Sequence, residues 1–228
     1  MKVVSLLLFV CACGTSDSSA LLTKGITPEI TVSTKGDGKA NVVAELFEGA
    51  PLQLIFVDLM ADDELVASTG GTSMTLHQNQ LLNIIAYEAS FSTGNPGDEF
   101  TIDFQRTLDD GAPSSTVTLP TPFTLDAVAT TSARTAAINV TYAPSGTADM
   151  MSWQATGECI QTATGAAMAD SGAFTIPANT FMIVGSTTSC TVTLNVTRQR
   201  TGVVDAHYRS GGQILGEQVR TAMFTSTP

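Results

Sequence analysis

Few residues in this sequence are of the types that commonly carry out catalysis. Only two histidines are present, His77 and His207, and they lie far apart in the chain. General-base catalysis and zinc binding both rely on histidine. The motifs Gly-x-Ser-x-Gly and His-Glu-x-x-His and the phosphate-binding loop, which position a nucleophile, a metal or a nucleotide, are all missing from the sequence. We therefore predict that the protein is not an enzyme and expect no cofactor.

Clustered carboxylates are the remaining candidates for ion binding. The candidates for calcium are Asp62, Asp63, Glu64, Asp109 and Asp110, which lie in or near predicted turns. Calcium prefers several oxygen ligands at once, and clustered carboxylates supply them. However, none of these clusters has the spacing of a calcium-binding loop, and aspartate is common in turns for conformational reasons. The prediction is that no metal is bound, with these five residues kept as calcium candidates.

The N-terminal residues have the pattern of a secretory signal. Lys2 is followed by an uncharged, mostly apolar run over residues 3–12. At 1.5 Å per residue this run is about 15 Å long, half of the roughly 30 Å of a bilayer core. It is therefore too short for an ordinary membrane span, and we predict a signal peptide over residues 1–12.

The end of this segment, FVCACG at residues 9–14, resembles the lipobox of bacterial lipoproteins. Val10 and Ala12 fit the aliphatic and small positions before the modified cysteine, which makes Cys13 the lipidated residue; the cysteine between them departs from the pattern. The resemblance implies cleavage before Cys13 and acylation with palmitate-type chains, which together anchor a protein stably. Because Gly14 rather than Asp follows Cys13, it also implies the outer membrane, with the periplasmic or outer side left open. The alternative is a plain signal peptide.

Two cysteines remain once Cys11 is removed and Cys13 is lipidated. These are Cys159 and Cys190, and in an oxidising compartment such a pair is expected to form a disulfide. Closing a loop of about 30 residues stabilises a fold by roughly 3–4 kcal/mol in the chain-entropy model. Two separate thiols are the alternative.

Composition and strand patterns predict an all-β fold. The chain is rich in threonine and poor in lysine, which favours strands. From residue 28 onward, short apolar or alternating runs are separated by turn residues; Phe100, Ile102 and Phe104, for example, alternate with polar neighbours. No segment has a sustained helical period.

The chain divides near residue 123. Pro120 and Pro122 cannot both lie in a central strand, because each removes a ladder donor. We predict a flexible tether over residues 13–27, an acidic β-sandwich over 28–123 and a β-sandwich with the disulfide over 124–228. Two tandem sandwiches of this size resemble immunoglobulin-like or fibronectin-like domains in architecture. A single larger jelly roll is the alternative.

Charge is distributed unevenly along the chain. Residues 14–124 contain 15 acidic and four basic residues, whereas residues 125–228 contain six and five, within a total net charge of −11. Such a charge excludes a nucleic acid as partner, since binding phosphates requires cations. Arg198, Arg200 and Arg209 are expected at solvated strand ends.

These patterns together predict a lipid-anchored envelope protein whose β-sandwich modules bind or scaffold without catalysis. The membrane is contacted through the anchor, and an envelope protein or a glycan is the expected partner, because sandwiches offer loops and strand edges for recognition. One alternative is an envelope hydrolase that acts on a polysaccharide through acidic residues. A second is a surface-fibre component, which an unpaired edge strand would support.

Overall fold

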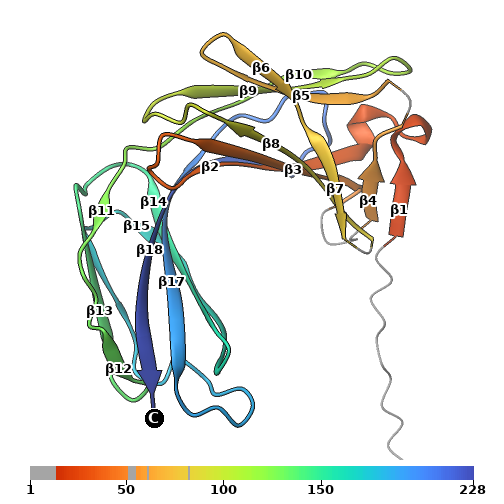
Figure 1. Ribbon diagram of the computed structural model, residues 1–228. Helices are drawn as coiled ribbons and strands as arrows, with labels where there is room; N and C mark the ends of the chain where they lie inside the picture. The colour runs from red at the N-terminus through yellow and green to blue at the C-terminus, as the bar shows by residue number, and fades with distance from the viewer. Residues whose placement is uncertain (1–13, 51–54, 61, 82) are drawn as a thin grey trace, which may run out of the picture.

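The computed structural model describes residues 14–50, 55–60, 62–81 and 83–228 (Figure 1). Within these ranges the chain forms strands, turns and two short 3-10 helices, η1 (Ser18–Ala20) and η2 (Thr23–Gly25), and no α-helix. The strands are β1 (Gly14–Asp17), β2 (Ile26–Thr34), β3 (Ala40–Glu48), β4 (Ile55–Asp58), β5 (Glu64–Thr69), β6 (Thr72–Thr75), β7 (His77–Leu81), β8 (Ile84–Phe91), β9 (Glu99–Gln105), β10 (Ala112–Thr118), β11 (Thr124–Leu125), β12 (Thr131–Ala133), β13 (Ile138–Ala143), β14 (Met150–Gly157), β15 (Ile160–Ala169), β16 (Ala173–Ile176), β17 (Cys190–Thr201) and β18 (Gln213–Thr227).

One large sheet runs through the whole molecule. It has 11 strands, and its main path is β1-β4-β3-β2-β18-β17-β14-β15, with β8 also pairing with β3, β7 with β8, and β12 with β18. A four-stranded sheet (β10-β9-β5-β6) and a three-stranded sheet (β11-β13-β16) pack against it. Figure 1 shows the large sheet bent like an arch, with the two small sheets on its outer side.

The first hydrophobic core lies between the large sheet and the four-stranded sheet. Alternate residues of β2, such as Ile30 and Val32, point into it and are almost fully buried. From the other side, Phe100 meets the ring of Phe91 edge to face at 5.3 Å. The period of two along these strands buries one face of each sheet, which is the arrangement of a β-sandwich. We call this unit the first sandwich.

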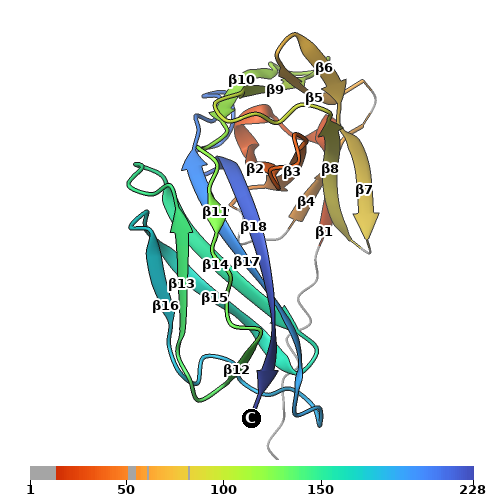
Figure 2. The same cartoon turned by 60° about the vertical axis from the view of Figure 1, so that its left-hand side comes forward.

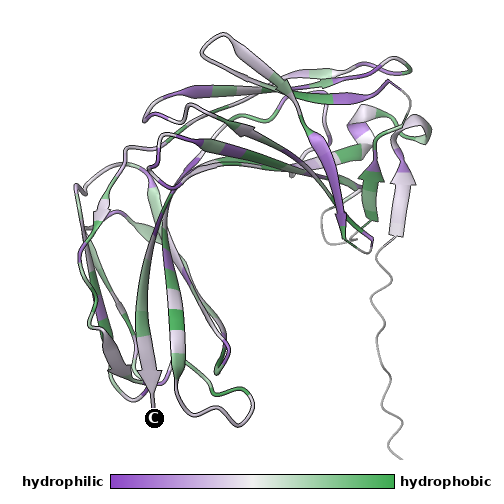
Figure 3. Ribbon diagram, in the orientation of Figure 1, coloured by the Kyte–Doolittle hydropathy of each residue, from purple (hydrophilic) through white to green (hydrophobic). Residues whose placement is uncertain are grey.

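The second hydrophobic core lies between β14, β15, β17 and β18 and the three-stranded sheet (Figure 2). Trp153 is 6% exposed in this core, and the rings of Phe181 and Phe224 lie 5.8 Å apart. Along β17, apolar side chains alternate with threonine and asparagine, as the colour bands of Figure 3 show. We call this unit the second sandwich. The prediction of an all-β chain with β-sandwich folds is therefore confirmed.

The two sandwiches share the long hairpin β17–β18. The C-terminal half of β18 places Phe224 in the second core, whereas Ile214 at its start and Tyr208 in the hairpin loop belong to the first core. The start of β18 pairs in parallel with β2, with Ile214 opposite Ile30. The first core takes buried residues from Ile26 to Leu119 together with Tyr208 and Ile214, and the second core takes buried residues from Phe123 to Phe224. Two tandem domains need only a linker between them, whereas these two sandwiches also share one sheet.

Residues 14–27 are ordered against the first sandwich, which corrects the prediction of a flexible tether over this range. β1 pairs in parallel with β4, with Gly14 opposite Ile55. The guanidinium group of Arg106 is fully buried and donates to the carbonyl oxygens of Ser18 and Leu21 at 2.6 and 3.0 Å. These charge-assisted hydrogen bonds from Arg106 hold the backbone of a segment whose composition predicts flexibility.

The linker between the sandwiches is held by side chains of β17 and β18. Arg198 is fully buried and donates to the carbonyl oxygen of Thr121 at 2.9 Å and to the carboxylate of Asp170 at 3.1 Å. Arg220 donates to the carbonyl oxygen of Phe123 at 2.8 Å. The prediction that Arg198 is solvated is wrong, because linker carbonyls and a buried carboxylate replace water around it.

Candidate functional site

The face of the large sheet turned away from both cores is a continuous surface, which we call the inner face. Side chains opposite each other in register lie on the same face of a sheet. One row of such residues crosses six strands, from β14 to β8. It consists of Met150, Gln199, Glu217, Ser33, Asn41 and Ser90. In Figure 1 this face lines the inside of the arch, so both sandwiches contribute to one surface.

Hydroxyl and amide groups dominate the inner face of the second sandwich. Besides three apolar residues, Met150, Val219 and Met223, it presents these polar residues: Ser152, Gln154, Thr156, Thr191, Thr193, Asn195, Thr197, Gln199, Thr201, Thr221 and Thr225. Thr221 donates to the side-chain oxygen of Asn195 at 2.8 Å. Hydroxyl and carboxamide groups donate and accept hydrogen bonds without charge. This surface is thus equipped to bind a neutral, polar ligand.

Four glutamates add negative charge to the inner face of the first sandwich. They are Glu29, Glu45, Glu88 and Glu217. Glu29 lies directly opposite Glu45 on the neighbouring strand. Burial raises the pKa of Glu45, and the charge of Glu29 raises it further; burial also raises the pKa of Glu217. Two partly buried carboxylates side by side repel each other, which favours the protonated form of one of them. A ligand that donates hydrogen bonds to the carboxylates would also reduce this repulsion.

A second candidate site is a pocket of about 350 Å³ at the end of the first sandwich. Its lining comes from three segments that are distant in sequence: η2 with Lys24, the turn after β9 with Asp109 and Asp110, and the β17–β18 loop with His207. Tyr208 in the same loop stacks on Phe104 at 5.9 Å, with the rings nearly parallel. This stacking anchors the loop, and with it His207, on the first sandwich.

Asp205 orients His207 at the rim of this pocket. The Nδ1 atom of His207 lies 2.7 Å from Oδ1 of Asp205, and Ser114 donates its hydroxyl to Oδ2 of Asp205 at 2.6 Å. Although burial opposes it, hydrogen bonds from His207 and Ser114 lower the pKa of Asp205 to about 2. In a serine-histidine-aspartate triad the hydroxyl contacts the imidazole. Here the hydroxyl donates to the carboxylate instead, so these three groups are not arranged as such a triad, and the imidazole of His207 stays half-exposed.

The structure brings two calcium candidates together around an arginine. Nε of Arg106 lies 3.1 Å from Oδ2 of Asp63, and its Nη1 lies 3.5 Å from Oδ2 of Asp109. The backbone N–H of Thr23 also donates to Asp109 and holds the pKa of that carboxyl below its usual value. The guanidinium thus occupies the position that a metal would take between these carboxylates.

The other calcium candidates do not join this group. Asp62, Glu64 and Asp110 are exposed. In the part of the chain that the structure describes, no three His, Cys, Asp or Glu side chains are placed to hold a metal ion.

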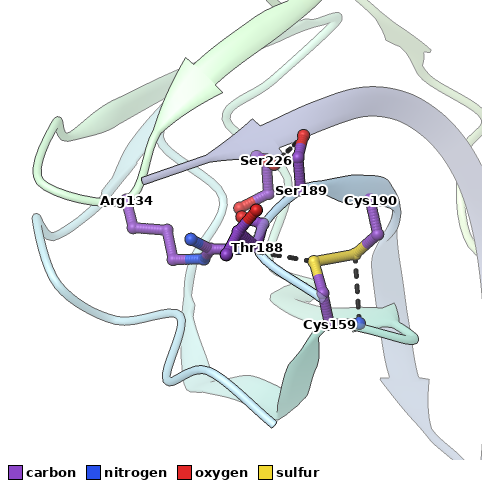
Figure 4. Close-up of a disulfide and its surroundings, with 6 residues drawn as sticks. All are labelled: Arg134, Cys159, Thr188, Ser189, Cys190 and Ser226. Atoms are coloured by element: carbon purple, nitrogen blue, oxygen red, sulfur yellow. Dashed lines mark hydrogen bonds between the residues drawn. A yellow bond between two sulfur atoms is a disulfide. The ribbon is translucent and has the colours of Figure 1, made fainter. Parts of the chain in front are cut away.

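Cys159 and Cys190 form a disulfide, with their Cα atoms 5.7 Å apart (Figure 4). The bond joins the turn between β14 and β15 to the first residue of β17, and both cysteines are buried in the second core. Beside it, Arg134 donates to the carbonyl oxygen of Thr188 at 2.6 Å. The predicted pairing is confirmed, and its place in the core gives it a structural role.

Cys13, the predicted site of lipidation, lies outside the described residues, as do residues 1–12. None of the helices in the described ranges has the length and hydropathy needed to cross a bilayer.

No family model matches this sequence, and no curated protein matches it. Among solved structures, the chain is similar to the FN1–FN3 domains of chicken CNTN1, with 10% identity, a TM-score of 0.25 and coverage of 88% of this chain and 65% of that one. It is also similar to the adhesin InvE of Yersinia pseudotuberculosis, with 12% identity, a TM-score of 0.25 and coverage of 89% and 59%.

A third similar structure is the Bacteroides ovatus SGBP-B of a mixed-linkage glucan utilization locus, in complex with a mixed-linkage heptasaccharide. It shows 15% identity, a TM-score of 0.22 and coverage of 86% of this chain and 60% of that one. The chain thus spans less than two thirds of each of these structures. At these identities and TM-scores no function passes from them to this chain. The fold itself defines the class: an all-β protein of two β-sandwiches joined by a shared sheet.

Sequence reasoning missed both candidate surfaces. The inner face was visible in part, because β17 alternates Val192 and Leu194 with Thr191 and Thr193. The pocket was not, since no sequence signal relates Lys24 and Asp109 to His207. Only the return of the β17–β18 loop to the first sandwich brings these residues together.

Proposed function

We propose that this chain is a lipid-anchored, non-enzymatic binding protein of the bacterial cell envelope, and that its inner face holds an envelope protein or a glycan. The observation that carries the proposal is the six-strand row from Met150 to Ser90, which makes one polar surface out of two sandwiches. A rigid, continuous surface binds an extended ligand with little loss of its own conformational freedom.

The chemistry of the inner face supports a ligand rich in hydrogen-bonding groups. Threonine hydroxyls and the amides of Asn195 and Gln199 pair with sugar hydroxyls or with peptide groups. The glutamates of the first sandwich accept hydrogen bonds at the other end of the same surface. Peptides and glycans both carry the repeated donors and acceptors that such a surface satisfies.

Anchoring and location belong to the same proposal. The lipobox-like residues 9–14 support acylation of Cys13 and attachment to the outer membrane. The mass of the mature N-terminus, after expression in a bacterial host, tests this directly. We expect a lipid adduct on Cys13; an unmodified cysteine would refute the anchor and leave the binding proposal standing.

Binding is tested by cross-linking in intact cells, followed by mass spectrometry. A photo-reactive residue at Thr221, exposed on the inner face, should give an adduct with an envelope protein or a glycan. The matched control carries the same residue at Asn139, which is exposed on the three-stranded sheet. Equal labelling at both positions, or none at Thr221, would contradict a binding role for the inner face.

The Glu29–Glu45 pair favours a second candidate function, hydrolysis of a polysaccharide. A glycosidase needs one carboxyl group that stays protonated beside one that is ionised. Burial and the neighbouring charge of Glu29 raise the pKa of Glu45 in that direction. If this candidate holds, the protein releases reducing ends from envelope glycans, and Glu45→Gln abolishes the release. Binding of the glycan without turnover would exclude it.

A further inference from the structure

A pocket of about 240 Å³, which we call the junction pocket, lies where the two sandwiches meet. Its walls come from the β2–β3 loop, the loop before β9, the linker and the middle of β18. The lining residues are Gly36, Gly38, Gly94, Asn95, Pro96, Pro122, Gln218 and Arg220. In Figure 1 the β2–β3 loop lies at the bend of the arch, beside the second sandwich. Because neighbouring residues of a strand point to opposite faces, Arg220 lies on the face opposite to Thr221 and the inner face.

The guanidinium group of Arg220 lies in this pocket with part of its hydrogen-bonding capacity unused. A Cβ atom at Gly36 would lie 2.8 Å from Cζ of Arg220, and Cζ lies 5.3 Å from the centre of the Phe123 ring. The Nε atom donates to the carbonyl oxygen of Phe123 at 2.8 Å. Nη1 donates to the carbonyl oxygen of Val219 at 2.8 Å, and Nη2 donates to Oε1 of Gln218 at 3.1 Å. A guanidinium group has five N–H donors, so two of them have no partner among the described residues.

Arg220 also differs from its neighbouring arginines, because no carboxylate neutralises its charge. Arg198 lies 3.1 Å from Asp170, and Arg200 lies 2.7 Å from Asp149. In the described ranges, no carboxylate oxygen lies within 4.0 Å of Arg220. Burial lowers the pKa of Arg220, and the charge of Arg198 lowers it further. A partly buried cation beside another cation is stabilised when an anion lies against it.

The β2–β3 loop adds positive charge to the rim of the junction pocket. Lys35 and Lys39, two of the four bases among residues 14–124, flank its glycines and are exposed. Asp37 lies between them and accepts from the backbone N–H of Lys39 at 3.1 Å. In the loop before β9, Asp98 accepts from the backbone N–H of Asn95 at 2.8 Å. With Arg220, three basic and two acidic residues surround the pocket, in a chain whose net charge is −11.

Close backbone contacts form the pocket before any ligand is bound. A Cβ atom at Gly94 would lie 2.6 Å from the carbonyl carbon of Lys39, so the loop before β9 packs directly on the β2–β3 loop. Gly36 and Gly38 have φ values of 82° and 79°, which glycine adopts without strain. A site whose walls are already in place binds a small ligand at little cost in chain ordering.

We propose that the junction pocket binds an oxyanion group, the carboxylate or phosphate of a small ligand, through the two unpaired N–H groups of Arg220. Guanidinium groups match the paired oxygens of carboxylates and phosphates, and such charge-assisted hydrogen bonds are stronger than neutral ones. A water molecule takes up about 30 Å³ in the liquid. The pocket therefore has room for an oxyanion and a short body attached to it, but not for a polymer.

A bound oxyanion connects parts of both sandwiches. It contacts β18 and the linker on one side and the loops of the first sandwich on the other. A ligand that binds the folded chain but not the unfolded chain stabilises the fold. The site lies on the face opposite to the inner face, so its occupancy does not depend on what the inner face binds.

Thermal unfolding of the full chain in acetate or in phosphate tests this, with chloride at the same ionic strength as the reference. At roughly ten times the dissociation constant, the melting temperature should rise by about 3–6 °C. A rise with acetate alone assigns the site to carboxylates, a rise with phosphate alone assigns it to phosphates, and a rise with both assigns it to either group. No rise with either anion overturns the inference.

Two matched variants separate the pocket from general effects of salt on the fold. Arg220→Gln removes the charge but keeps a side-chain amide, and it should abolish the anion-dependent rise whatever its own melting temperature. Arg209→Gln removes one positive charge at an exposed position outside the pocket and should leave the rise unchanged. A rise that survives in Arg220→Gln refutes the site.

A third variant decides the matter if Arg220→Gln does not fold. Lys39→Gln changes an exposed side chain on the rim of the pocket, so the fold should be retained. Loss of this charge should weaken binding of the anion about two- to fivefold. An affinity equal to that of the unmodified chain contradicts the proposal.

Discussion

At the scale of single residues, buried arginines organise this structure. Arg106 ties the N-terminal segment to the first sandwich, and Arg198 ties the linker to β17. Both side chains are fully buried and bonded to carbonyl oxygens and carboxylates. A buried charge is stable only when such partners replace its water. Each arginine therefore fixes the particular backbone segments that surround it.

Replacing Arg198 with methionine should be strongly destabilising. The variant keeps much of the side-chain volume but leaves the buried carboxylate of Asp170 without its cation. Breaking a buried pair in this way costs about 3–5 kcal/mol of unfolding free energy. Urea denaturation measures the loss. The control, Arg209→Ala at an exposed position, should change stability by less than about 0.5 kcal/mol. Equal effects of the two variants would contradict the role of Arg198.

The Asp205 cluster should make stability depend on pH in acid. The folded-state pKa of Asp205 is lowered to about 2, below the value of 3.8 expected for an unperturbed group. Its ionised form therefore stabilises the fold above pH 3.8, and this contribution is lost as the pH falls toward 2.

Thermal unfolding of Asp205→Asn at several pH values measures this contribution. The variant should melt below the unmodified protein at neutral pH, and the gap should narrow between about pH 4 and pH 2. Glu99→Gln, at an exposed position, is the control and should show no such gap. A gap for Asp205→Asn that is constant down to pH 2 would show that the carboxylate does not act through its charge.

At the scale of elements, the strands carry two different patterns on their two faces. Along β17, even-numbered residues from Val192 to Val196 fill the second core, and odd-numbered residues form the inner face. β15 differs, because it is the edge and is largely exposed. Trp153 on β14 covers it at Gly165, its partner in register. The edge strand is thus held by its pairing with β14 and by the contact between Gly165 and Trp153.

Gly165→Ala should loosen β15. A Cβ atom at this position would lie 2.0 Å from Nε1 of Trp153, so the indole ring must move. We expect a loss of about 1–3 kcal/mol, as for other overpacked sites. Trp153 is the single tryptophan, so its emission should also shift to longer wavelength. Gly25→Ala, with no atom within 4 Å of the new methyl group, should change neither quantity.

At the scale of the whole molecule, the two sandwiches are joined by a shared hairpin. The hairpin β17–β18 contributes to both cores, and its side chains hold the linker residues Pro120 and Phe123 through Gln218 and Arg220. If this hairpin left its place in one sandwich, buried residues of the other core would become exposed as well. The arch of Figure 1 and its continuous inner face follow from this sharing.

Unfolding of the two sandwiches should therefore be coupled. Phe100→Ala creates a cavity in the first core, where the side chain is fully buried, and should cost about 3–5 kcal/mol. The fluorescence of Trp153, in the second core, should report the same shift in the unfolding midpoint as far-UV circular dichroism. Met182→Ala at the surface should shift neither. An unchanged Trp153 transition in Phe100→Ala would mean that the sandwiches unfold independently.

Local sequence patterns were sufficient to predict the strands and the disulfide. Alternation such as Phe100, Ile102 and Phe104 predicts strands because burial of one sheet face has a period of two. The pairing of Cys159 with Cys190 followed from there being two cysteines left to pair. The flexible tether was wrong because composition does not show that Arg106, some 85 residues further along the chain, binds Ser18 and Leu21.

The sequence by itself determined the all-β class, the sandwich folds and the disulfide, since each depends on residue type and short-range spacing. Tertiary structure alone decided that the loop after β17 returns to the first sandwich, that His207 meets Lys24 and Asp109 there, and that β15 is left open as an edge. The physical reason is that these features depend on which strands become neighbours. Strand pairing is set by packing across the whole chain, and no local period encodes it.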